Sequence, residues 1–178
     1  MSITEQQQTL PAATYGADKV HSSVAFEVGY MGVGTFGGTV SDFDATLSGG
    51  RLSGSARIAS LETKDQNLHA HLMAPDFFDA EQHPVVSFAA ERSSVEGDRV
   101  SFEGEITIKG ITRPATLTGT VTGPVTDPYG NERYGLKLET VVDRTEFGIT
   151  WNNDMPNGTK ALDDEVTLTA DLSLVKAA

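Results

Sequence analysis

Short runs in which apolar and polar residues alternate place the strongest constraint on how this chain folds. The clearest run covers residues 100–109, where Val100, Phe102, Ile106 and Ile108 fall on one face and polar or charged side chains on the other. Successive side chains of an extended strand point to opposite sides, so such a run buries one face and leaves the other in water. The alternation therefore predicts half-buried β-strands and does not fit the period of a helix.

Eight segments share this pattern and are separated by turn sequences rich in glycine, proline, asparagine and aspartate. They cover residues 20–30, 39–47, 52–58, 85–92, 100–109, 116–121, 134–143 and 166–175. Eight short strands at regular spacing predict an all-β fold, either a barrel or a sandwich, built from antiparallel hairpins. Outward charges such as Glu103, Lys137 and Asp171 exclude an outer-membrane barrel, whose outer face must be apolar.

One segment departs from the strand pattern. Residues 67–82 carry Leu68, Leu72, Phe77 and Phe78 and predict a short helix, interrupted at Pro75, that caps one end of the barrel. The chain contains no repeat or linker. We therefore expect one domain over residues 14–178, preceded by a flexible N-terminus at 1–13.

Charge and composition exclude several classes of partner. The 178 residues include 13 basic and 25 acidic side chains, and the formal net charge of −12 repels nucleic acids and anionic membranes. No stretch has the roughly 20 apolar residues of a membrane helix, so we expect no stable membrane insertion. Residues 1–13 show neither a basic leader nor an apolar stretch, which predicts a cytoplasmic protein.

The usual signatures of catalysis and metal binding are weak. Residues 32–37 match the GxGxxG pattern of dinucleotide sites, but the expected continuation as strand favours a hairpin turn over a cofactor loop. The histidines are His21, His69, His71 and His83, and their spacing favours surface positions over metal ligation. The sequence therefore predicts no enzyme, no metal and no cofactor.

The apolar inner face of the predicted barrel has two interpretations. Eight strands can simply fill their interior with side chains, or they can leave room for one slender ligand. Several inward positions are small, which favours the second reading, although glycine also permits a barrel wall to coil. These positions are Gly54, Ala56, Ala90, Gly104, Gly119 and Ala170.

Several ordered blocks of the sequence resemble one known family, the YceI-like polyisoprenoid-binding proteins. The resemblance extends over residues 18–175 and rests on the segments 18–26, 34–36, 71–79, 83–88, 104–114 and 143–151. The segment 71–88 is the most specific, with His71-Leu-Met-Ala-Pro-Asp-Phe-Phe-Asp79 followed by His83-Pro-Val-Val-Ser-Phe88. The chain departs from the family pattern at Tyr30, Met73 and residues 153–162, which predicts different loops at the mouth.

The resemblance implies a lipocalin-like, eight-stranded antiparallel barrel that binds a polyisoprenoid or prenylquinone-like lipid, often as a homodimer. Family members are frequently exported. On this basis the expected lumen residues are Phe26, Val28, Phe36, Val86, Phe88, Phe102, Ile106, Leu117, Leu136, Leu138 and Leu168. Leu72, Phe77 and Phe78 are expected at the mouth or lid, with ordinary packing of that segment as the alternative.

Two other functions stay open beside a lipid carrier or store. The barrel can be filled and act as a protein-interaction or stress-response module through its acidic exterior. An enzyme that acts on a lipid would need ionisable side chains facing the lumen, and the assigned inward positions offer almost none.

Overall fold

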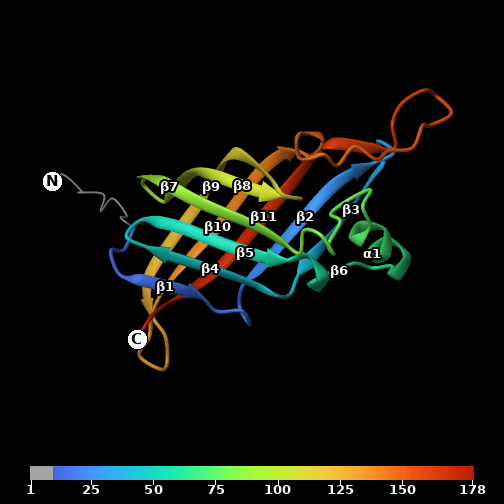
Figure 1. Cartoon of the computed structure of the whole chain (residues 1–178). Helices are drawn as coiled ribbons and strands as arrows, with labels where there is room; N and C mark the ends of the chain where they lie inside the picture. Colours follow the sequence, from blue (N-terminus) through green and yellow to red (C-terminus); the bar gives the residue numbers. More distant parts are fainter. Residues whose placement is uncertain (1–9) are drawn as a thin grey trace.

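Antiparallel strands form the wall of a closed barrel in the computed structural model, which describes residues 10–178 (Figure 1). The strands are β1 (Thr14–Ala17), β2 (Ser23–Tyr30), β3 (Gly34–Val40), β4 (Phe43–Ser48), β5 (Arg51–Arg57), β6 (Leu61–Glu62), β7 (Val85–Glu96), β8 (Arg99–Ile108), β9 (Ile111–Thr126), β10 (Glu132–Asp143) and β11 (Leu162–Lys176). The helices are α1 (Gln66–Met73) and two 3₁₀ turns, η1 (Ile58–Ser60) and η2 (Arg144–Phe147). Residues 1–9 of the predicted flexible N-terminus lie outside the described part of the chain.

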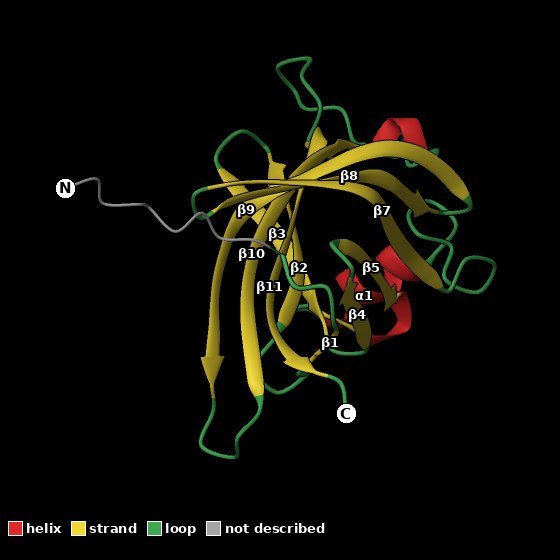
Figure 2. Cartoon of the chain, turned by 90° about the vertical axis from the view of Figure 1, so that its left-hand side faces the viewer, coloured by secondary structure: helices red, strands yellow, loops and turns green. Residues whose placement is uncertain are grey.

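Eleven strand segments make an eight-stranded barrel because three of its strands are bent. β1 and β2 both pair with β11, β4 and β3 pair with β1 and β2, and β5 and β6 pair with β4 and β3. β7 to β11 then follow as neighbours in chain order, and the β1–β11 ladder closes the barrel. The predicted all-β, eight-stranded antiparallel barrel is confirmed. Figure 2 shows the strands winding around one interior.

Burial follows the alternation in β8. Val100, Phe102, Ile106 and Ile108 are all buried, whereas the glutamates between them are exposed. The strand predicted over residues 20–30, with Val20 on its apolar face, begins too early, since Val20 is 84% exposed and β2 begins only at Ser23. The Asp18 carboxylate accepts a hydrogen bond from the Val20 amide at 3.0 Å, and this local turn interrupts the strand.

The half of the barrel away from α1 is filled with side chains. Tyr15, Leu47, Phe102, Leu136 and Leu174 are each at most 1% exposed there. The rings of Tyr15 and Tyr134 meet edge to face at 5.2 Å, and the Tyr15 hydroxyl donates a 2.7 Å hydrogen bond to Glu132. Burial and the Glu132 carboxylate raise the pKa of Tyr15 to about 12. These buried residues belong to the same apolar core cluster that continues around the α1 end of the barrel.

The helix covers the opposite end, next to β3 and β6 (Figure 1). Its N-cap is Asp65, whose carboxylate accepts hydrogen bonds from the amides of Asn67 and Leu68. The predicted interruption at Pro75 is confirmed, since α1 ends at Met73 and Ala74 is extended before the proline, but the helix does not resume in the rest of residues 67–82. The chain then continues in turns that keep Leu72 and Phe77 buried. Within residues 10–178, no helix has the length and hydropathy needed to cross a bilayer.

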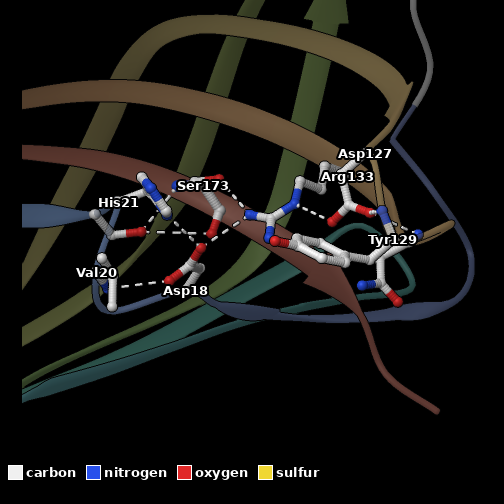
Figure 3. A network of polar contacts seen from close by, with 9 residues as sticks. Asp18, Val20, His21, Asp127, Tyr129, Arg133 and Ser173 are labelled. Carbon is white, nitrogen blue, oxygen red and sulfur yellow. Dashed lines mark hydrogen bonds and ion pairs between the residues drawn. The ribbon is translucent and has the colours of Figure 1, made fainter.

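A charged network fastens the β1–β2 bend to the barrel wall (Figure 3). Arg133 on β10 donates hydrogen bonds to Asp127 at 2.8 Å, to Asp18 at 2.9 Å and to Ser173 on β11 at 3.2 Å. Asp18 also lies 2.7 Å from the His21 ring nitrogen. The hydrogen bonds from Arg133 and from backbone amides lower the pKa of Asp127 to about 2. His21 and Arg133 likewise lower the pKa of Asp18.

These lowered pKa values predict loss of stability in acid. An unfolded aspartate binds its proton near pH 3.9, whereas folded Asp127 does so only near pH 2, so the unfolded state gains protons first as the pH falls. We expect the free energy of unfolding to decline between about pH 4 and pH 2, and the Arg133→Gln variant to show a shallower decline. Denaturant titrations at several pH values across this range measure the free energy of unfolding of each protein. Arg113→Gln, which removes an exposed arginine from β9, should keep the wild-type slope; equal slopes in all three proteins would contradict the assignment.

Candidate functional site

The half of the barrel near α1 contains a cavity of about 160 Å³. Its wall comes from β2 to β11 and from the turn after α1, and most of its lining side chains are apolar. Eight of the predicted ligand-binding residues line it: Phe26, Phe78, Val86, Phe88, Ile106, Leu117, Leu138 and Leu168. The structure therefore brings residues from six separate strands together around one apolar space.

Small side chains explain why this half is hollow. Gly54, Ala56 and Ala170 line the cavity at positions where larger residues would fill it. The other small residues have different roles. Ala90 is buried in the core, and a Cβ at Gly104 or Gly119 would lie 2.0 Å or 1.6 Å from a carbonyl oxygen of the neighbouring strand. Those two glycines allow close approach of the strands and contribute no space.

Four predicted lumen residues do not line the cavity. Phe102 and Leu136 are 0% exposed and belong to the packed half, and Val28 is buried in the wall. Phe36 is half-buried and contacts the rings of Phe26 and Tyr30. The alternation identifies which residues of a strand point inward, but it does not say how far along the barrel axis each residue lies. The prediction therefore included residues of the packed half together with residues of the cavity.

Several lining residues were not among the predicted ones. They are mainly Val40, Leu52, Ile58, Leu61, Ile108, Thr140 and Leu172. Most of them fall on the apolar face of a predicted strand, so the alternation already indicated that they point into the barrel. Choosing among them required knowledge of the strand pairing, which sequence spacing does not provide.

The three predicted mouth residues separate into two groups. Phe78 reaches the cavity, and its ring lies 6.2 Å from that of Phe26. Leu72 and Phe77 are buried in packing contacts instead, and Phe77 lies 5.4 Å from the ring of Trp151. The segment after α1 is thus packed on one side and exposed to the cavity through Phe78 on the other.

Arg144 holds the loop against which this segment packs. It is 5% exposed and donates hydrogen bonds to the carbonyl oxygens of Ile149, Trp151 and Asp163 at 2.8 to 2.9 Å. Burial lowers the pKa of its guanidinium, which the nearby carboxylate of Asp164 opposes. Arg144 therefore fixes Trp151 beneath α1, a positioning role that sequence spacing did not reveal.

The cavity offers little for acid–base chemistry. Asp44 is the one ionisable residue among its described lining residues, and its carboxylate is 76% exposed and ion-paired with Lys19 at 3.3 Å. His71 lies against the rings of Phe77 and Trp151, and no group of three potential metal ligands occurs within residues 10–178. The GxGxxG segment forms the turn between β2 and β3 and the first residues of β3, as the strand interpretation predicts, so the element that directly follows the turn is a strand.

Comparison with known proteins agrees with this architecture. A UPF0312 protein of Pseudomonas putida is 30% identical over 148 residues, which make up 78% of this chain and 77% of the relative. The crystal structure of BcnA of Burkholderia cenocepacia shares the fold with a TM-score of 0.69, at 19% identity over 90% of this chain and 99% of that one. A domain of Saccharophagus degradans described as a polyisoprenoid-binding domain has a TM-score of 0.67, at 10% identity over 94% and 100% of the chains.

The sequence as a whole also matches a defined protein family. The matching description is the YceI-like domain, and the match extends over residues 15–174. These residues include every residue that lines the cavity and all of the barrel strands except the first residue of β1 and the last two of β11. This chain therefore belongs to the YceI-like family.

Proposed function

We propose that this protein binds an apolar lipid of the isoprenoid type inside the barrel and carries or stores it. The observation that supports the proposal most is the apolar cavity between the packed half and Phe78. The Saccharophagus degradans domain that shares the fold is described as polyisoprenoid-binding, which favours the same class of ligand here. A prenylquinone fits as well as a plain polyisoprenoid, since the cavity recognises the chain.

The size of the cavity limits how much of a ligand it holds at rest. A volume of about 160 Å³ is close to the roughly 150 Å³ that holds one benzene, and therefore suits about one isoprenoid unit. Burying its five carbons contributes about 4 kcal/mol before the losses of binding. A longer lipid chain needs more space than this cavity provides. The segment after α1 is the part of the wall that can provide it by moving, because Phe78 is the one residue by which this segment lines the cavity.

The proposal includes no catalytic step. An enzyme acting on the lipid would need an ionisable group at the cavity surface, and Asp44 points into solvent toward Lys19. The competing function is a protein-interaction or stress-response module that uses the acidic exterior. It requires no ligand, so the contents of the cavity distinguish the two functions.

Native mass spectrometry of the detergent-free protein tests the proposed function directly. We expect an added mass that solvent extraction identifies as a prenyl lipid, or else uptake of added geranylgeraniol. A protein that carries no ligand and takes up none would overturn the proposal and favour the interaction module.

Filling the cavity should abolish binding without harming the fold. The double variant Ala56→Leu, Ala170→Leu adds apolar volume where both residues line the cavity. We expect at least a tenfold weaker affinity for geranylgeraniol, with an unchanged or higher melting temperature. Phe102→Leu is the control in the packed half: it should cost about 1–2 kcal/mol of stability and leave affinity unchanged. Wild-type affinity in the filled variant would refute the cavity assignment.

Long ligands should displace the segment after α1. We expect geranylgeraniol to increase hydrogen exchange in residues 74–83, whereas a five-carbon prenyl alcohol should leave it unchanged, because the resting cavity already accommodates one unit. Protection in β8 of the packed half provides the internal control. Unchanged exchange with a bound twenty-carbon chain would show that the cavity expands elsewhere.

The homodimer implied by the family resemblance is part of the same proposal. Sedimentation equilibrium at micromolar concentrations should give twice the monomer mass of 18.9 kDa. A single monomeric species across the concentration range would exclude a dimer without affecting the lipid proposal.

A further inference from the structure

Three exposed apolar side chains gather at the tip of the β2–β3 hairpin. Tyr30 and Met31 are each 41% exposed, and Val33 is 92% exposed. They account for three of the eight large exposed hydrophobic residues of the described chain, within four consecutive positions. Scattered exposed apolar residues are ordinary, whereas a cluster on one turn indicates contact with an apolar surface.

The backbone at this tip is strained for the residue it carries. The Val33 amide donates a hydrogen bond to the Tyr30 carbonyl across a tight turn, in which Met31 has a φ of 57° and Gly32 a φ of 71°. Asparagine or glycine is the usual residue at such left-handed positions, and a side chain like that of methionine is disfavoured. Because Met31 is substantially exposed, burial within the protein does not fully offset this cost.

A row of aromatic rings connects the tip with the cavity. Successive ring centroids lie 6.1 Å apart for Tyr30 and Phe36, 6.4 Å for Phe36 and Phe26, and 6.2 Å for Phe26 and Phe78. Phe26 and Phe78 both line the cavity. An apolar path therefore extends from the most exposed apolar turn at this end of the barrel to the proposed lipid site.

We propose that the tip formed by Tyr30, Met31 and Val33 docks on the surface of a lipid bilayer, from which the ligand passes along this ring row. The inference rests on the proposed function, because a long apolar lipid resides in a bilayer when it is not bound to protein. Three side chains cannot provide the roughly 800 Å² per partner of a stable protein interface, but they suffice for shallow insertion between lipids. The net charge of −12 favours a neutral bilayer over an anionic one.

The other end of the barrel provides a contrast. Val125 and Tyr129 are 58% and 87% exposed in and beside the β9–β10 turn, so apolar exposure alone is similar there. The packed half separates that turn from the cavity, and the Asp127–Arg133 ion pair lies beside Tyr129. Docking through that end would not lead to the lipid site.

Co-sedimentation with phosphatidylcholine vesicles tests the docking surface. The variant Met31→Asn, Val33→Asn removes two apolar side chains and places asparagine where the left-handed backbone favours it. We expect at least a fivefold smaller vesicle-bound fraction with an unchanged or higher melting temperature. The control variant Val125→Asn, Tyr129→Asn should sediment like the wild type. Equal loss in both variants, or no binding of the wild type, would overturn the proposal, as would self-association that only the tip variant loses.

A second measurement separates this inference from the proposed function. Geranylgeraniol is supplied either in vesicles or from a dilute ethanol solution. We expect the tip variant to take it up from ethanol with wild-type affinity but from vesicles at least fivefold more slowly. Wild-type rates from vesicles would refute docking alone. A wild-type protein that binds the probe from neither source would refute the proposed function.

Discussion

Closure of the sheet by the pairing of β11 with β10 on one side and with β1 and β2 on the other determines the rest of this structure. A closed barrel has no free edge, and all inward side chains share one interior whose size the strand number sets. With the strand number fixed, the volume of the inward side chains decides how much of the interior is filled. Filling the interior stabilises the fold, and small side chains in part of it create a cavity at the expense of packing contacts.

The chain combines both solutions along one barrel axis. Tyr15 and Phe102 fill one half, while Ala56 and Ala170 leave space in the other. The packed half anchors the ends of the long strands, so the hollow half is held in shape by continuous ladders such as β10–β11. Most of the side chains that line the cavity are apolar and need no hydrogen-bond partner, which explains why the fold tolerates a cavity at this place.

Much of this was predictable from residue patterns, and the limits are physical. The alternation in residues 100–109 specifies both the strand and its buried face, because a side-chain period of two admits no other geometry. The alternation cannot specify whether Phe102 or Ile106 faces the cavity, because this depends on how far neighbouring strands are shifted relative to one another around the barrel. The end of α1 follows from Pro75, but the exposure of Val20 follows from a hydrogen bond to Asp18, which competes with strand formation.

The buried Arg144 shows how the mouth of the site depends on residues remote from the cavity. Its guanidinium donates hydrogen bonds to the carbonyl oxygens of Ile149 and Trp151 in the loop before β11 and of Asp163 at the start of β11. It thereby fixes Trp151, against which His71 and Phe77 pack. The segment that carries Phe78 is held from outside by the packing of Phe77 on Trp151 and by the hydrogen bond from Lys109 to the Pro75 carbonyl, whereas on its inner side Phe78 contacts the ring of Phe26. A ligand that replaces those inner contacts can move Phe78 while Trp151 stays in place, because the two sides of the segment are held by different interactions.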